Sequence, residues 1–365
     1  MSRLEVVEIA EIRLPNEGIY QVLKMVAPGM PLREGLENVL RAKTGALIVV
    51  GENPAMKEIV DGGFRLDTEF SPANLYELAK MDGAIILSND ARRILYVNAM
   101  LLPDASISST ETGIRHRTAE RVARSTGLLT ISISQRRNII TLYKGTFKYS
   151  LKDIGVILSK ANQAIQTLDK YQAVFHQAVS SLGVLEFEEM VNLSDVTSVL
   201  QRFEMLTRVV KEITRYIVEL GSEGRLIQMQ LEELIADIDQ EGYLVIKDYL
   251  HMGEGRSLDT VLSDMAAMSS EDLLDMTNFS RILGYGGSAD ALDQPVLSRG
   301  HRILSRIPRL PLPIIENVVE AFGTLQNILT ASIEELDEVE GIGEVRARSI
   351  KEGLRRLQQK LLIDR

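Results

Sequence analysis

The pattern of hydrophobic and polar positions changes near residue 150. Before that point, short apolar runs of the kind that form buried strands alternate with amphipathic segments of helical spacing. This alternation is typical of an α/β domain, and we predict one for residues 1–150, with a central mixed sheet. The predicted strands are residues 46–51, 84–87, 94–101, 128–134 and 138–145.

Helix signals fill the remainder of this first domain. Residues 1–40 have helical spacing, and Pro31 stands at a plausible helix start. Residues 62–83 are predicted to be a loop followed by a helix, with Ser71 as the N-cap and Pro72 in the first turn. A further helix is expected to end at Gly127.

Residues 151–295 have a helical pattern almost throughout, with long amphipathic segments bounded by Gly, Ser or Asn. We predict an all-α, elongated middle domain that acts as a spine. It holds 24 acidic residues against 11 Lys and Arg, which indicates a solvated acidic face. The Gly-rich stretch at 282–287 has no strand before it and is interpreted as a bend between helices.

From 296 to 365 the helices are short, and we predict a third, DNA-binding domain.

Composition excludes several classes of function. The chain has no cysteine and only four widely spaced histidines, so disulfides, thiolate catalysis and zinc–thiolate sites are excluded. A metal would be held by carboxylate and substrate oxygens, which favours Mg²⁺ or Mn²⁺. No apolar run approaches the length of a membrane span, and acids interrupt the apolar pattern at the N-terminus. We therefore expect a cytoplasmic protein without membrane contact.

Charge is distributed unevenly along the chain, whose net charge is −10. Residues 115–150 hold eight Lys and Arg against one acid, Glu120. Within them, Arg115, His116 and Arg117 stand side by side after Gly113 and Ile114, at the start of a predicted helix. Three such side chains cannot all be buried, but they can face a polyanion together with the free N–H groups of a helix N-terminus. The alternative is a solvated basic loop.

Asp82 and Gly83 stand where a helix gives way to a buried strand, at the edge of the sheet where ligands of α/β folds often bind. An Asp-Gly pair is also common in turns. Its significance comes from the cations downstream, which include Arg136 and Arg137 between two strands. One metal-binding carboxylate among many cations suits phosphoryl or nucleotidyl transfer.

The third domain contains a specific turn, which we call the Gly-Ile-Gly turn (Gly341, Ile342 and Gly343). One helix ends before it, Ile342 is expected to anchor it, and a second helix begins after it with Arg346 and Arg348 in its first turn. The free N–H groups at that start can bind phosphate, as in the helix-hairpin-helix module that contacts the DNA backbone without reading sequence. The alternative is a turn whose glycines serve packing only. An upstream segment at 307–322 is interpreted as a degenerate first hairpin.

Three motifs in this order resemble the DNA-integrity scanning diadenylate cyclases: residues 81–88, 112–121 and 134–143, followed by the acidic helical middle and the hairpin. The resemblance covers essentially the whole chain. It implies that two ATP molecules are condensed into cyclic di-AMP with release of two pyrophosphates. It also implies face-to-face pairs of cyclase domains, a homo-octamer of four such pairs, and suppression of the cyclase by branched or junction-like DNA.

The resemblance also implies roles for individual residues. Asp82 matches the aspartate that binds the metal and activates the hydroxyl, and Gly83 lies against the nucleotide. Ile114 is apolar, so only its backbone can contact the phosphates. Gln135 is neutral, so the side of the site formed by residues 134–137 depends on Arg136 and Arg137 for its charge. The implied ATP-binding residues are Gly83, Leu101, Ile114, Arg115, His116, Arg117, Thr118, Ser134, Arg136 and Arg137, of which Arg115, His116 and Arg117 are also catalytic with Asp82.

A second function is compatible with the same residues. The chain could be a non-enzymatic binder of DNA junctions whose α/β domain senses ATP, and such a sensor would tolerate the loss of Asp82. The sequence is compatible with two ways in which DNA binding could be transmitted to the nucleotide site. One is a change in the pairing of the cyclase domains, and the other is a shift of the acidic spine.

Overall fold

The computed structural model describes residues 17–236, 238–251 and 256–363, so the helix predicted within residues 1–16 lies outside it. The chain packs into two compact units. Of the described residues, one unit contains 17–162 together with 214–228, and the other contains 163–213 and those from 229 to 363. The long helices of the middle region contribute to both. The boundaries at 150 and 295 remain a prediction.

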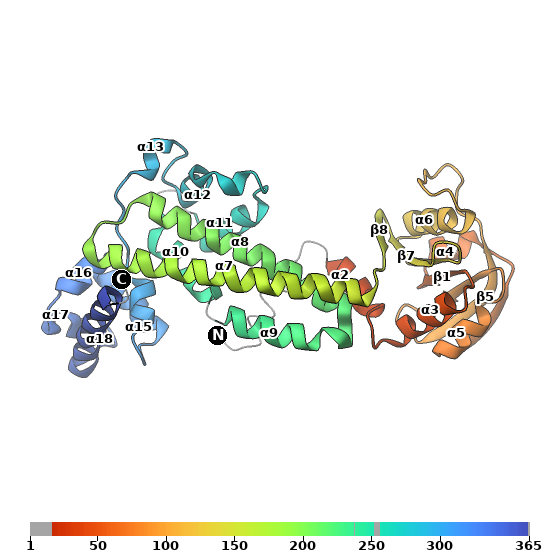
Figure 1. Ribbon diagram of the computed structural model, residues 1–365, viewed down its shortest axis with the longest axis horizontal. Coiled ribbons are helices and arrows are strands. Elements are labelled where there is room, and N and C mark those ends of the chain that lie inside the picture. Colours follow the sequence, from red (N-terminus) through yellow and green to blue (C-terminus); the bar gives the residue numbers. More distant parts are fainter. Residues whose placement is uncertain (1–16, 237, 252–255, 364–365) are drawn as a thin grey trace. The chain divides into compact units, whose positions relative to one another are not determined.

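A single mixed sheet forms the core of the first unit (Figure 1). Its order is β2-β5-β4-β1-β6-β7-β8, and β3 pairs with β5. The pair β1–β4 is parallel, and every other pair is antiparallel. The strands are β1 (Ala46–Val50), β2 (Val60–Asp61), β3 (Phe64–Glu69), β4 (Ala84–Leu87), β5 (Arg93–Leu101), β6 (Leu129–Ser134), β7 (Ile139–Lys144) and β8 (Phe147–Ser150).

Helices cover both faces of the sheet. On one face, α3 (Pro31–Arg41) and α5 (Pro72–Leu78) pack against Ile48, Ile85 and Ile131, and α2 (Glu17–Met25) joins the same core. On the other, α4 (Pro54–Ile59) and α6 (Ile114–Thr126) pack against Val49 and Ile86. Because both faces are covered, the central strands are continuous apolar runs rather than alternating ones.

Most local signals in this domain are confirmed. Pro31 begins α3, the Ser71 side chain accepts a hydrogen bond from the Asn74 N–H, and Gly127 ends α6 in the left-handed conformation. The loop predicted before Ser71 is wrong, because β3 occupies Phe64–Glu69. That strand is largely exposed at the sheet edge and carries charged residues, so it has no apolar signal. The short strands β2 and β8 and the helix α4 were not predicted.

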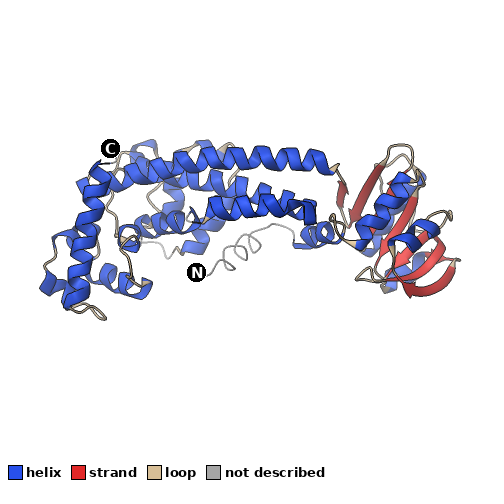
Figure 2. Cartoon of the chain, turned by 60° about the horizontal axis from the view of Figure 1, so that its bottom comes forward, coloured by secondary structure: helices blue, strands red, loops and turns tan. Residues whose placement is uncertain are grey.

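The described residues after 150 are mainly helical, and every strand that the structure describes belongs to the first unit (Figure 2). The Gly-rich stretch at 282–287 is a bend, as predicted: Gly284 ends one helix in the left-handed conformation. The elements are α7 (Ile154–Glu188), α8 (Leu193–Leu220), η1 (Gly221–Gly224), α9 (Arg225–Ile235), α10 (Ile238–Tyr249), α11 (Leu258–Ala267), η3 (Asp272–Leu274), α12 (Met276–Leu283) and α13 (Ala289–Leu292). Among the described residues, no helix combines the length and the apolarity that crossing a membrane requires.

The C-terminal helices surround a separate hydrophobic core. Ile303, Val318, Ile328 and Ile350 are fully or almost fully buried there. The segment 307–322, interpreted as a degenerate hairpin, consists of most of the loop between the first two of these helices and the whole of the second one. The C-terminal helices are α14 (His301–Ser305), α15 (Leu312–Phe322), α16 (Leu325–Thr330), α17 (Ile333–Asp337) and α18 (Glu344–Ile363).

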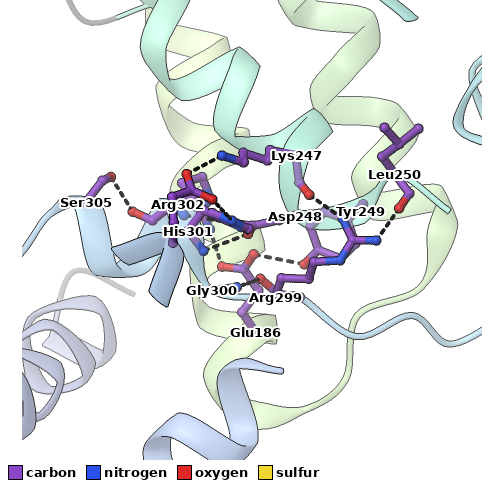
Figure 3. A network of polar contacts seen from close by, with 12 residues as sticks. Glu186, Lys247, Asp248, Tyr249, Leu250, Arg299, Gly300, His301, Arg302 and Ser305 are labelled. Atoms are coloured by element: carbon purple, nitrogen blue, oxygen red, sulfur yellow. Dashed lines mark hydrogen bonds and ion pairs between the residues drawn. The ribbon is translucent and has the colours of Figure 1, made fainter. Parts of the chain in front are cut away.

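A buried polar network joins this core to the helical middle (Figure 3). Asp248 of α10 accepts hydrogen bonds from the backbone N–H groups of His301 (2.7 Å) and Arg302 (3.0 Å) at the start of α14. The side chain of Arg302 is fully buried and forms an ion pair with Glu186 of α7, which also accepts a hydrogen bond from the Tyr249 hydroxyl at 2.8 Å. Removing one partner of such a pair leaves an uncompensated buried charge, so the network fixes the arrangement of α7, α10 and α14.

Candidate functional site

A cavity of about 820 Å³ opens at one edge of the sheet. It lies at the amino ends of β1 and β4, at the carboxyl ends of β5 and β6, and at the start of α6. Of the residues predicted for the nucleotide site, all except Arg117 line it: Asp82, Gly83, Leu101, Ile114, Arg115, His116, Thr118, Ser134, Arg136 and Arg137. The fold therefore brings three distant sequence motifs to one place.

The position of the cavity differs from the usual rule for α/β folds. Ligands of open parallel sheets bind beyond the carboxyl ends of the strands. Here the only parallel pair among the described strands, β1 and β4, presents its amino ends. The cavity lies at the edge predicted from Asp82. That edge differs from the usual one because β5 and β6 run antiparallel to this pair and contribute their carboxyl ends.

Gly83 has a structural requirement that differs from the predicted one. A Cβ atom on Gly83 would lie 2.3 Å from the backbone carbon of Asn98 in β5. The glycine is therefore needed for the close approach of two strands, although its backbone also lines the cavity. Asp82 directly precedes it and forms part of the cavity wall.

The N-terminus of α6 borders the cavity. Gly113 is the N-cap and has no side chain to cap the first N–H groups, which leaves them available to a ligand. The side chain of Ile114 is 80% exposed, as expected for a residue that can serve only through its backbone. The Arg115 guanidinium packs on Gly45, where a Cβ atom would lie 2.0 Å from Nη1.

The basic residues of 115–150 separate into two groups. Several hold the loop that precedes α6: Arg121 donates to the Ile107 and Ala105 carbonyls, and Arg124 donates to the Ser108 carbonyl. The Arg117 guanidinium donates to the Thr112 carbonyl at 3.2 Å. By contrast, the side chains of Arg115, Arg136 and Arg137 line the cavity and form no hydrogen bond or ion pair with the residues described here. Three cations, rather than the whole block, are available to an anion.

His116 is half-buried in the cavity wall, and its Nδ1 lies 3.2 Å from the Ser132 hydroxyl. Burial lowers the pKa of the His116 imidazole, and the nearby cations Arg137, Arg115 and Lys148 lower it further, against the opposing effect of Glu111. His116 is therefore neutral at pH 7 and can donate or accept a hydrogen bond.

Glu111 also lines the cavity and was not identified from the sequence. Burial alone would raise the pKa of its carboxyl, but hydrogen bonds from Lys148 and from the Tyr143 hydroxyl (2.9 Å) outweigh this and lower the pKa. Asn98, Met100 and Thr112 were missed as well. Except for Thr112, which begins the motif at 112–121, none belongs to a recognisable motif, because strand pairing and a loop bring them to the cavity.

Among the described residues, no group of three or more His, Asp or Glu side chains could hold a metal by itself. Asp82 and Glu111 are the carboxylates of the cavity, and Glu111 is already paired with Lys148. One free carboxylate fits a Mg²⁺ or Mn²⁺ ion whose other ligands are water and substrate phosphates.

The Gly-Ile-Gly turn lies between α17 and α18, as predicted. Ile342 is buried in the C-terminal core, and Gly341 has a positive φ of 79°. A Cβ atom on Gly343 would meet nothing within 4 Å, so the start of α18 faces open space. Arg346 donates to the Gly341 carbonyl at 2.5 Å, and Arg348 pairs with Glu344.

Comparison with known proteins identifies three regions. Residues 33–147 match a family described as DisA bacterial checkpoint controller nucleotide-binding, 151–292 match its linker region, and 324–353 match a helix-hairpin-helix motif. The chain is 62% identical over 346 residues to the DNA integrity scanning protein DisA of Carboxydothermus hydrogenoformans, covering 95% of this chain and 98% of that protein. It is 60% identical over 347 residues to the protein of the same name from Bacillus subtilis, covering 95% and 96%. These matches confirm the predicted fold class and the resemblance.

We expect the pKa of His116 in the free protein to lie below about 6.5, because burial and three cations disfavour the imidazolium. Binding of inorganic triphosphate should raise it, because a polyanion beside the ring favours the charged form. NMR titration of the histidine Cε1–H resonances between about pH 5 and 8 measures this, with His116→Asn to assign the signal. A midpoint that is above 6.5 in the free protein, or that triphosphate does not move, would contradict this picture of the cavity.

Proposed function

This chain belongs to the family of the DNA integrity scanning protein DisA, and we propose that its nucleotide-binding domain condenses two ATP molecules into cyclic di-AMP and two pyrophosphates. The observation that supports this most is the composition of one cavity. It combines a carboxylate (Asp82), a helix N-terminus without a side-chain cap, and three arginines whose side chains have no partner in the described part of the chain. An ATP needs cations for its triphosphate and a carboxylate near the reacting hydroxyl.

In the proposed reaction, the 3′-oxygen of one ATP attacks the α-phosphorus of the other. A P–O bond forms, the bond from the α-phosphorus to the bridging oxygen breaks, and pyrophosphate leaves. The hydroxyl proton departs by way of the Asp82 carboxylate to solvent. Arg115, Arg136 and Arg137 bind the phosphates and neutralise the leaving group. A second, equivalent attack closes the ring.

The expected cofactor is Mg²⁺ or Mn²⁺, which Asp82 and phosphate oxygens would hold and which lowers the pKa of an adjacent hydroxyl. Asp82 fits this role because it lines the cavity without an ion-pair partner among the described residues. The neutral His116 is placed to form a hydrogen bond to a phosphate oxygen.

Two cavities are needed for two ATP molecules, because one Asp82 and one set of arginines make half of a two-substrate site. We propose that cyclase domains pair face to face. The apolar side chains of Met100 and Ile114, at the cavity wall, are 61% and 80% exposed, and such pairing would cover them. Following the family resemblance, we propose an octamer of four such pairs, located in the cytoplasm.

For the C-terminal domain we propose binding of branched DNA, which suppresses the cyclase. The helix-hairpin-helix match and the open space at Gly343 support backbone contacts to phosphate at the start of α18. Arg346 and Arg348 are exposed and could exchange their present partners for the same strand. Such binding would be weakened by salt.

The second candidate is a non-enzymatic binder of DNA junctions that senses ATP. The cavity favours the enzyme, because a sensor needs the arginines for the triphosphate but needs no carboxylate to accept a proton. Asp82 therefore separates the two functions.

Asp82→Asn should lower the rate of cyclic di-AMP formation by about 10²- to 10⁴-fold, because the variant loses the proton acceptor and the metal ligand. The measurement is chromatography of the products after incubation with ATP and Mn²⁺ or Mg²⁺. Wild-type protein without product would support the sensor, and a variant as fast as the parent would exclude the proposed role of Asp82.

Arg115→Ala should weaken ATP binding by about 10- to 100-fold, since a hydrogen bond to a charged group contributes about 1.5–3 kcal/mol. The matched control is Arg117→Ala, because Arg117 carries the same charge two residues away but does not line the cavity. Calorimetric ATP titration should show a smaller loss for it, with both melting temperatures close to the parent's. Equal losses would mean that both arginines bind the phosphates.

Gly343→Asp should weaken binding to a branched duplex by at least about tenfold, because it places a carboxylate in the space proposed for a phosphate. Cyclase activity without DNA should be unchanged. Fluorescence anisotropy with labelled junction DNA measures the affinity. Undiminished binding would show that the DNA contacts lie elsewhere.

A further inference from the structure

Strand β5 contains a bulge beside the cavity. Ala84 of β4 is paired with Ala99, whereas Ile86 is paired with Tyr96, so Val97 and Asn98 together lie opposite the single residue Ile85. Asn98 has a left-handed backbone, with φ at 51°. Asn tolerates this conformation better than most residues. Bulges often stand next to active sites, where they redirect a side chain.

Two glycines enclose this bulge. A Cβ atom on Gly83 would lie 2.4 Å from the Cα of Asn98, and a Cβ atom on Gly63 would lie 2.8 Å from the carbonyl oxygen of Val97. Both clashes are with backbone atoms, which cannot move aside as a flexible side chain can. The backbone of the bulge is therefore fixed from both sides, and the position of the Asn98 side chain is fixed with it.

The Asn98 side chain points back to the start of β4. Its Oδ1 accepts a hydrogen bond from the backbone N–H of Gly83 at 3.2 Å, and the residue itself lines the cavity. Gly83 directly follows Asp82. The hydrogen bond therefore holds the peptide that carries Asp82, in a turn that precedes the regular pairing of β4.

We propose that Asn98 is a positioning residue for Asp82. Its amide oxygen fixes the Asp82–Gly83 turn and so determines where the Asp82 carboxylate stands in the cavity. This inference rests on the proposed cyclase function. A displacement of about 1 Å at a reacting group can cost about a hundredfold in rate. The role is distinct from a conformational one, in which any residue that tolerates a positive φ would serve as well.

Asn98→Gly separates the two roles, because glycine keeps the left-handed backbone but removes the acceptor. We expect kcat for cyclic di-AMP formation to fall at least tenfold. The affinity for 3′-deoxy-ATP, which cannot react, and the melting temperature should stay close to those of the parent. Asn98→Asp retains an acceptor for the Gly83 N–H and should keep more of kcat than Asn98→Gly.

Asn138→Gly is the matched control. Asn138 is also left-handed, with φ at 52°, belongs to the same unit and does not line the cavity. It should leave kcat near the parent value. An unchanged kcat in Asn98→Gly, an equal fall in Asn138→Gly, or parallel losses of kcat, affinity and melting temperature would each overturn the positioning role. A parent protein that binds 3′-deoxy-ATP but forms no cyclic di-AMP would instead refute the cyclase function, and the inference with it.

Discussion

The pairing of β1 with its two neighbours is the constraint on which the site depends. Parallel pairing aligns Ile48 with Ile85, and antiparallel pairing aligns Ala46 with Ile133. The start of β4 and the end of β6 therefore meet at one sheet edge, which carries Asp82 and the residues after Ser134. A shift of one residue in either pair would turn each apolar side chain to the opposite face, and both faces are covered by helices. Burial thus specifies the site's geometry.

Electrostatics then determine which charged residues remain available. Cations that can reach loop carbonyls or a buried carboxylate are used there: Arg124 pairs with the buried Glu120, and Lys148 pairs with Glu111. These contacts hold the loop before α6 and leave in the cavity three arginines without a side-chain partner among the residues that the structure describes. The high local charge therefore has two functions, ordering a loop and offering an anion site. A charge count along the sequence cannot separate them, because the two kinds of arginine are chemically identical.

In the second unit, too, some polar groups are used in packing while others remain available to a ligand. Arg302 is surrounded by Glu186 and other polar groups in a buried network, so its charge has a structural use. At the Gly-Ile-Gly turn, Ile342 is buried, while Val345 in the next turn is 83% exposed and Gly343 faces open space. One short segment thus anchors itself through an apolar side chain and presents its backbone outward.

The sequence by itself determined the order of the three regions, most of the strands and helix ends, and the motifs at Asp82 and Arg115, because apolar periodicity, caps and short motifs are local signals. It could not determine β3, whose edge position removes the apolar pattern, or the roles of Asn98 and Glu111, which come from strand pairing and a loop. It predicted Gly83 only as a ligand contact, and the structure adds that the close approach of β5 requires a glycine there. Only the tertiary structure decided which cations face the cavity and which strand ends meet there, since both depend on contacts between residues far apart in the chain.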